Sequence, residues 1–257
     1  MKISLITAVY NNASGLRSSL ESSLGQTHQE VERIVIDGGS TDGTLQVLED
    51  YTSKIDHIVS EPDNGIYDAL NKGIQLATGD IIGILHSDDL FAGRNILETI
   101  ASKFESSSID LLYGDLCYVS NENPNKIVRY WRAGAFTQSK LPNGWMPPHP
   151  TVYVRRELFE KYGLYDIHYR IAADYDWMLR LLTKQTLDVA YFPEVLVHMR
   201  TGGASNRSFK NLWQKSREDY LILRNHQIGG VIALIKKNVR KLSQFWKRPK
   251  CNKAYID

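Results

Sequence analysis

The sequence predicts an α/β fold: a mixed, mostly parallel central sheet with helices on both sides. Over the first 90 residues, short apolar runs alternate with segments of helical spacing, as in strand–crossover–strand units. The runs 34–36 and 81–85 are almost entirely apolar, which is typical of strands that are buried on both faces. Both runs lead into acidic loops, and open α/β sheets hold their ligands just beyond the carboxyl ends of strands.

In the first third of the chain, strands and helices follow one another with clear boundaries. Ser14 is a candidate cap for the first helix, and Gly25 is suited to end it. The expected strands are 3–9, 31–37, 55–60 and 81–85, and the expected helices are 14–24, 44–51 and 66–77.

After Asp89 the regular alternation stops. We expect helices at 95–104, within 152–162, at 174–184 and at 207–225, and strands at 110–119, 126–133, 187–192 and 195–199. The segment 135–150 is rich in Pro and Trp and is expected to be irregular. No internal repeat or low-complexity linker interrupts the chain, which favours two halves on one shared sheet over two separable domains.

Composition excludes several classes of protein. A net charge of only +2 argues against a dedicated nucleic-acid binder. Cys117 and Cys251 are too far apart in sequence to suggest a disulfide framework or a zinc site, which fits a reducing cytoplasm. The apolar start of the chain is too short for a signal peptide, and no run approaches the roughly 20 apolar residues of a membrane span. We expect a cytoplasmic protein, either free or peripheral at the inner face of the cell membrane.

Asp37 ends the strand 31–37 and begins the glycine-rich loop 37–44. Its carboxylate has the acceptor capacity to bind the planar donor edge of a nucleotide base. Asp is also common in turns and as a helix cap, so both interpretations stay open at this stage.

Ser87-Asp88-Asp89 follows the most apolar strand of the chain. Adjacent carboxylates repel each other unless a cation or hydrogen-bond donors compensate. A hard divalent ion, shared with the oxygens of a diphosphate, is the natural partner for such a pair. Adjacent acids are also common on surfaces, but the position at a strand end favours function.

Asp174 and Asp176 precede the amphipathic segment 177–182. Either acid can act as a helix N-cap. An acid at a helix start can also be a general base that takes a proton from an attacking hydroxyl. The two roles are compatible if one Asp caps the helix and the other reacts.

Two further positions carry open alternatives. Arg200 lies in the loop 198–205 and is either a diphosphate ligand, in a loop that closes over the donor, or an ordinary surface residue. His149, between Pro148 and Pro150, is either an acceptor-site residue or a structural histidine.

Five motifs follow one another in the first 90 residues. They are Ser4-Leu5-Ile6-Thr7-Ala8-Val9-Tyr10-Asn11, Asp37-Gly38-Gly39-Ser40-Thr41-Asp42-Gly43-Thr44, Glu61 to Gly73, Ala77-Thr78-Gly79-Asp80 and Ser87-Asp88-Asp89. Together they resemble the family 2 inverting glycosyltransferases of the GT-A fold. The resemblance covers roughly residues 1–205, and the stretch 64–73 is similar to the branch found in bacterial O-antigen and capsule biosynthesis.

The resemblance implies a role for each matching position. The nucleotide base would be held by Thr7, Ala8, Tyr10 and Asp37. Asp88 would face the ribose or sugar, Asp89 would bind Mn²⁺ or Mg²⁺ on the diphosphate, and Asp174 would be the base.

The chain departs from the family pattern at three positions. Ser87 and Ala173 stand where the family has acids, which leaves the metal ligand but removes an acceptor contact. Leu70 stands where many relatives have Arg, and Lys72 is a candidate for the missing positive charge on the donor.

These residues lead to one main functional hypothesis and two alternatives. The main one is an inverting glycosyltransferase that moves a sugar from a UDP-hexose to a lipid-linked saccharide in surface polysaccharide biosynthesis. A sugar-nucleotide nucleotidyltransferase would need a glycine-rich loop with a basic residue after the first strand, and Tyr10-Asn11-Asn12-Ala13 has neither. A non-catalytic nucleotide-binding module would not need Asp88, Asp89 and Asp174.

The expected organisation is a GT-A domain at 1–205, with a nucleotide-sugar half at 1–90 and an acceptor half at 91–205. Residues 206–257 are expected to form a helical, basic amphipathic extension. In 231–250, Ile232, Ile235, Val239, Leu242 and Trp246 share one helical face among many basic residues. Such a helix either lies on an anionic membrane surface or packs its apolar face on the domain.

Overall fold

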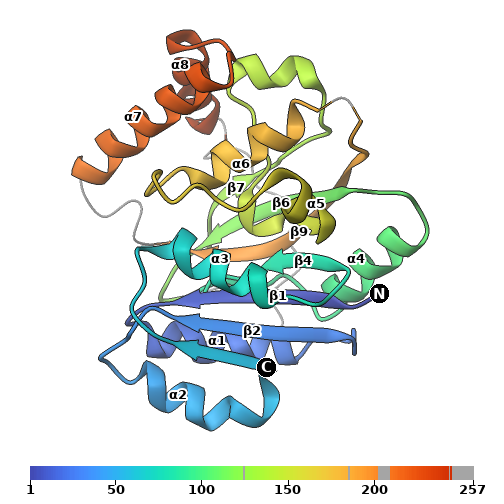
Figure 1. The fold of residues 1–257 in the computed structure, drawn as a ribbon, viewed down its shortest axis with the longest axis vertical. Helices are drawn as coiled ribbons and strands as arrows, with labels where there is room; N and C mark the ends of the chain where they lie inside the picture. Colours follow the sequence, from blue (N-terminus) through green and yellow to red (C-terminus); the bar gives the residue numbers. More distant parts are fainter. Residues whose placement is uncertain (124, 185, 202–208, 243, 245–257) are drawn as a thin grey trace.

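The computed structural model describes residues 1–123, 125–184, 186–201, 209–242 and 244. In this part of the chain one mixed sheet has the strand order β3-β2-β1-β4-β8-β6-β9-β5, with β7 paired to β6 (Figure 1). The strands are β1 Ile3–Val9, β2 Val31–Asp37, β3 His57–Ser60, β4 Ile81–Ile84, β5 Leu90–Phe91, β6 Leu111–Val119, β7 Ile127–Trp131, β8 Tyr153–Arg155 and β9 Val189–Arg200. The helices are α1 Ala13–Leu24, α2 Thr44–Tyr51, α3 Ile66–Leu76, α4 Ile96–Glu105, α5 Glu157–Tyr162, α6 Ala173–Leu182, α7 Phe209–Asn225 and α8 Val231–Leu242, and the 3₁₀ turns are Thr52–Lys54, Gln138–Asn143 and His149–Thr151.

The predicted fold class is confirmed. Strands β3, β2, β1 and β4 are parallel neighbours, and strands from both halves of the chain share the one sheet. The bounds predicted for β1 and β2 are those of the structure. Helix α1 begins at Ala13 with Asn12 at the N-cap position, so the prediction of Ser14 as the cap is wrong.

Alternate residues of the central strands face two different helical layers, as the two-residue period of a strand requires. Ile6 and Ile36 pack with α3, whereas Leu5 packs with α4 and Val35 with α1 and α2. Both faces of the sheet are therefore covered, and this explains why its strands read as continuous apolar runs.

The second half differs from the prediction in its strands. β5 and β8, which the sequence did not predict, join the sheet as antiparallel strands of two and three residues. The two short strands predicted at 187–192 and 195–199 are one strand, β9, whose pairing with β6 shifts register between Tyr113 and Leu116. Pro193 lies opposite this irregularity, where a strand tolerates a missing N–H.

Helix α3 lies very close to the sheet because Gly73 faces it. A Cβ atom at Gly73 would lie 2.5 Å from Ile6 Cγ2, which is closer than side chains allow. The glycine therefore sets the height of α3 above β1, and with it the position of Tyr67 on the same helix.

Helices α7 and α8 stand together at one end of the molecule, next to α6 (orange and red, Figure 1). Side chains of α8 reach the 3₁₀ turn Gln138–Asn143 at its C-cap Gly144, where a Cβ atom would lie 2.5 Å from Lys237 Cβ. Within the residues that the structure describes, none of the helices is both long and apolar enough to cross a bilayer.

Candidate functional site

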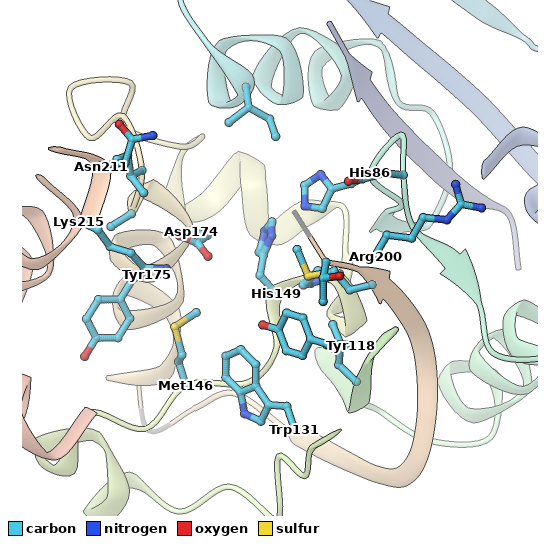
Figure 2. Close-up of a pocket in the computed structure, with 18 of the residues that line it drawn as sticks. His86, Tyr118, Trp131, Met146, His149, Asp174, Tyr175, Arg200, Asn211 and Lys215 are labelled. Atoms are coloured by element: carbon cyan, nitrogen blue, oxygen red, sulfur yellow. The ribbon is translucent and has the colours of Figure 1, made fainter. Parts of the chain in front are cut away.

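A cavity of about 1320 Å³ opens at the carboxyl ends of β1 and β4. Its far side is formed by β7, the start of α6 and the helices α7 and α8 (Figure 2). This volume exceeds the roughly 300–1,000 Å³ of a site for one drug-sized ligand, so two substrates can fit side by side. Of the predicted site residues, the cavity is lined by Ala8, Tyr10, Asp88, His149, Asp174 and Arg200.

The loops after β1 and β2 form one hydrogen-bonded unit at the edge of the cavity. The Asn11 side-chain oxygen accepts from Thr41 N at 2.8 Å, and Asn11 N donates to Ser40 Oγ at 2.8 Å. Asn12 Nδ2 donates to Ser87 Oγ at 3.1 Å and so ties this unit to the loop after β4. Three strand ends are thereby held in one arrangement, with Tyr10 exposed above them.

Asp37 is fully buried beneath these loops and does not line the cavity. Ser40 N and Oγ and Ser60 Oγ donate to its carboxylate, with Ser60 Oγ at 2.7 Å from Oδ2. Gly43 occupies the N-cap position of α2, so Asp37 is not the cap of that helix. A carboxylate has about four acceptor positions, and three donors leave some of this capacity for a ligand.

Thr7 and Lys72 also lie outside the cavity lining. Thr7 is buried within β1. Lys72 Nζ pairs with Glu61 Oε1 at 2.7 Å and donates to Pro62 O at 3.3 Å. The charge of Lys72 is thus compensated within its own surroundings.

Asp89 is completely buried, and neither of its carboxylate oxygens has a hydrogen-bond partner in the described part of the chain. Burial raises the pKa of Asp89 well above its ordinary value, the charge of Asp88 adds to this, and Arg200 opposes it. A buried carboxylate without a partner is costly, and a hard divalent cation removes that cost. The described residues hold no group of three or more His, Cys, Asp or Glu side chains that could bind a metal, and Asp89 does not line the cavity.

His198 is a buried histidine of β9 that sequence reasoning did not single out as a site residue. It pairs with Leu90 in the sheet, and both of its ring nitrogens lack a hydrogen-bond partner among the described residues. The signal in the sequence was a histidine directly after the apolar run Val195-Leu196-Val197.

Asp174 approaches the cavity from the opposite side, in the first turn of α6 (Figure 2). Its Oδ1 accepts a hydrogen bond from the Tyr67 hydroxyl at 2.9 Å, and the same hydroxyl lies 3.0 Å from Ile171 O. Burial, with the nearby charge of Asp174, raises the pKa of Tyr67 well above its ordinary value, so Tyr67 remains a donor.

Neither predicted N-cap of α6 is observed. Ala172 occupies the N-cap position, and the carboxylate of Glu218 on α7 accepts from the N–H groups of Arg170, Ile171 and Ala172 at 2.8–3.2 Å. Glu218 thus holds the segment that leads into α6, no side chain caps the helix, and the Asp174 carboxylate faces the cavity.

Asp176 has a structural role instead. Its Oδ2 accepts from Arg180 Nε at 3.0 Å, and its Oδ1 lies 2.8 Å from His226 Nε2. These contacts join α6 to the end of α7, away from Asp174.

His149 lies between the two sides of the cavity and is buried. Its Nε2 is 2.8 Å from the Tyr165 hydroxyl. Burial lowers the pKa of His149 to about 4, against the opposing charge of Asp174. The His149 ring is therefore neutral at pH 7, so it can donate one hydrogen bond and accept another but carries no charge.

The chain is similar to a known protein family and to curated proteins of other organisms. The family model described as "Glycosyl transferase family 2" matches residues 4–163. A PGL/p-HBAD biosynthesis glycosyltransferase of Mycobacterium bovis is 32% identical over 208 residues, which cover 79% of this chain and 78% of that protein.

Solved structures share the fold at lower sequence identity. TarS 1–349 of S. aureus in complex with UDP has a TM-score of 0.65 and 19% identity over 95% of this chain and 72% of that one. The chain spans 44% of the length of a longer TarS structure. The mannosyltransferase PcManGT of Pyrobaculum calidifontis, in complex with GDP-Man and Mn²⁺, has a TM-score of 0.66 and 17% identity over 93% of this chain and 69% of that one.

Proposed function

This chain belongs to glycosyl transferase family 2, with the GT-A fold, and we propose that it transfers a hexose from UDP to a lipid-linked saccharide. The process it serves would be the biosynthesis of a surface polysaccharide such as O-antigen or capsule. The observation that carries the proposal is that Asp88 and Asp174 line one cavity from opposite sides.

The donor would lie over the carboxyl ends of β1, β2 and β4, as ligands do in open α/β sheets. Tyr10 and Ala8 would contact the base from the cavity lining. Thr7 and Asp37 are buried outside that lining, so they would reach the base only after the loops above them move. Asp88 would bind the ribose or sugar. Arg200 lines the same side of the cavity and would pair with the diphosphate, whereas Lys72 would act only after leaving Glu61.

The buried carboxylate of Asp89, which has no hydrogen-bond partner among the described residues, fits a divalent cation, Mn²⁺ or Mg²⁺. When bound, the cation would neutralise the charge that develops on the leaving diphosphate. PcManGT was solved with Mn²⁺, which supports a metal-dependent donor site in this fold.

Asp174 would take the proton from an acceptor hydroxyl. The hydroxyl oxygen would form a bond to the anomeric carbon, and the bond from that carbon to the diphosphate would break from the opposite face. The nucleotide diphosphate leaves with the electron pair, and the configuration at the anomeric carbon is inverted.

Each part of the chain would have its own role in this reaction. Residues 1–90 would hold the donor, residues 91–205 the acceptor, and residues 206–257 would form a helical extension. His149, a neutral ring between Asp174 and His86, would contribute a hydrogen bond to the acceptor or the transferred sugar.

Saturation-transfer NMR with UDP-glucose, UDP-galactose, UDP-N-acetylglucosamine and GDP-mannose tests the donor. We expect strong saturation transfer to the uracil and ribose protons of the UDP-sugars, because the proposed site contacts the nucleotide. Absence of transfer to every donor, with Mg²⁺ present, would contradict the proposed function.

Tyr67→Phe is expected to lower kcat by about tenfold and leave the donor KM unchanged. The hydroxyl holds the Asp174 carboxylate at 2.9 Å, and its loss would let the base adopt unproductive rotamers. Tyr51→Phe is the matched control, because the Tyr51 hydroxyl also donates to a carboxylate at 2.9 Å, that of Glu21, but away from the cavity. Steady-state kinetics that showed equal kcat values for the two variants would remove Tyr67 from the mechanism.

Helix α8 is amphipathic, but its apolar face is turned outward. Ile232 is 65% exposed, and Ile235 and Val239 are each 57% exposed, whereas Ala233 and Lys237 are buried against the domain. The alternative that this apolar face packs on the domain is therefore wrong for these residues. The side chains of Leu242 and Trp246, and the segment 245–250, lie outside the described residues.

The outward face supports peripheral binding to an anionic membrane, which we propose brings the enzyme to its lipid-linked acceptor. Exposed Lys236 and Arg240 on α8 add positive charge, and each basic residue near such a surface contributes about 1 kcal/mol.

Ile235→Asp is expected to reduce co-sedimentation with phosphatidylglycerol vesicles by at least about fivefold, since a charge cannot enter the acyl boundary without cost. Leu45→Asp places the same charge at an exposed apolar position on α2 and should leave binding unchanged. Equal vesicle binding by the two variants would refute the membrane role of α8.

A further inference from the structure

The cavity has a second cluster of positive charge, on the side away from the acids that follow β4. Figure 2 shows Lys215 and Asn211 beside Asp174 and Tyr175, and His86 and Arg200 across the cavity. The cluster consists of basic side chains from the segments before α6, on α7 and on α8, namely Arg170, Lys215, Lys237 and Arg240, and β7 adds Arg129.

Two carboxylates on this side, Asp219 and Asp174, already have partners. Asp219 forms an ion pair with Lys237, whose Nζ lies 2.7 Å from Asp219 Oδ1 and 3.2 Å from the centre of the Tyr175 ring. All three residues are buried. Asp174 accepts from Tyr67. Across the ranges that the structure describes, Arg170 and Lys215 form no ion pair with a carboxylate.

Two of the positive charges, Lys215 and Lys237, lie close enough to repel each other. Burial lowers the pKa of Lys237, Asp219 opposes this, and the charge of Lys215 lowers the pKa further. Like charges that crowd a concave, partly dehydrated wall raise its free energy and attract anions. A neutral acceptor would leave this cost without any compensation.

The donor does not account for the cluster. If the proposed function is right, Arg200 and a divalent cation would already offset the negative charge of the donor diphosphate, on the opposite side of the cavity. The second cluster instead adjoins Asp174, where the acceptor hydroxyl would have to lie.

We propose that the wall formed by Arg170, Lys215 and Arg240 is a second anion site, which binds a phosphate or diphosphate group on the acceptor. The inference rests on the proposed function and gives it a substrate class: the acceptor carries its phosphate close to the saccharide. Lys237 holds α8 in place as part of this wall, through Asp219 and the packing against Gly144.

Isothermal titration of the full-length protein with inorganic pyrophosphate, in saturating UDP and Mg²⁺, tests the proposal. UDP occupies the donor site, so any further pyrophosphate binding reports the second site. Lys215→Gln should weaken this binding about tenfold or more, as expected for a hydrogen bond between charged groups, and Arg170→Gln should act in the same direction.

Arg217→Gln is the matched control. It removes one positive charge from an exposed position on α7, two residues from Lys215, and it does not line the cavity. Its pyrophosphate affinity should equal that of the wild-type protein.

Two further arms separate the sources of phosphate. Geranyl phosphate should bind more weakly to Lys215→Gln than to the wild-type protein, whereas co-sedimentation with phosphatidylglycerol vesicles should be unchanged. Vesicle binding that depended on Lys215 while geranyl phosphate binding did not would assign the cluster to membrane headgroups and overturn the acceptor site.

The outcomes for the two proposals are distinguishable. UDP binding without pyrophosphate binding, or with equal binding by Lys215→Gln and Arg217→Gln, would overturn the anion site alone. Absence of UDP binding would overturn the proposed function and the anion site with it.

Discussion

Asp174→Asn is expected to lower kcat by about 10²–10⁴-fold, because general base catalysis typically contributes that much. Asparagine keeps the shape of the side chain and can still accept from Tyr67, but it cannot take a proton from an acceptor hydroxyl. The donor KM should stay within about twofold of the wild-type value, since the residue lies across the cavity from Asp88. Steady-state kinetics with saturating donor and acceptor provide the measurement.

Asp176→Asn is the control on the same helix. Asp176 binds Arg180 and His226, so its replacement should cost about 1–3 kcal/mol of stability and leave kcat nearly unchanged. If Asp174→Asn lost less than about tenfold in kcat, or if both variants lost the same, Asp174 would not be the base.

The second large effect is expected from Asp89→Asn, which should reduce metal-stimulated turnover by about 10²–10³-fold. The folded protein should survive, and without metal its melting temperature should equal or exceed that of the wild-type protein. The reason is that Asp89 is buried with no hydrogen-bond partner among the described residues, and a neutral amide costs less to bury than a carboxylate.

Asp50→Asn is the control for this variant, since Asp50 is an exposed acid that pairs only with Arg17 on the surface. Thermal melting and turnover, each measured with and without Mn²⁺, separate the two expected effects. A near-normal rate with an unchanged metal optimum, or a large drop in melting temperature without metal, would contradict the assignment of Asp89.

The strands and helices of the first half of the fold could be predicted from the sequence, because they depend on local patterns of apolar residues. β1 and β2 are β-branched runs with sharp ends, and their bounds are the predicted ones. β5 and β8 have only two and three residues, so their identity depends on partners that are distant in the sequence. The gap predicted between the strands 187–192 and 195–199 is absent, because an irregular pairing with β6 accommodates Pro193 within β9.

Some residues of the candidate site could also be predicted from local sequence patterns, and others could not. Asp88 and Asp174 were found because acids at a strand end and at a helix start are visible as motifs. Tyr67 was missed as a partner of Asp174 because 107 residues separate them, and only the packing of α3 brings them together. The charge cluster around Lys215 was missed because α7 reads as an ordinary polar helix until its position against α6 is known.

³¹P NMR of a UDP-hexose with the protein and Mg²⁺ shows whether the protein breaks the bond between the sugar and UDP. We expect the diphosphate signals of the UDP-hexose to decay and those of UDP to grow, slowly with water as acceptor and faster with an added phosphate-bearing saccharide. If added pyrophosphate instead produced UTP and a sugar 1-phosphate, the protein would be a nucleotidyltransferase, and the proposed glycosyl transfer would be wrong.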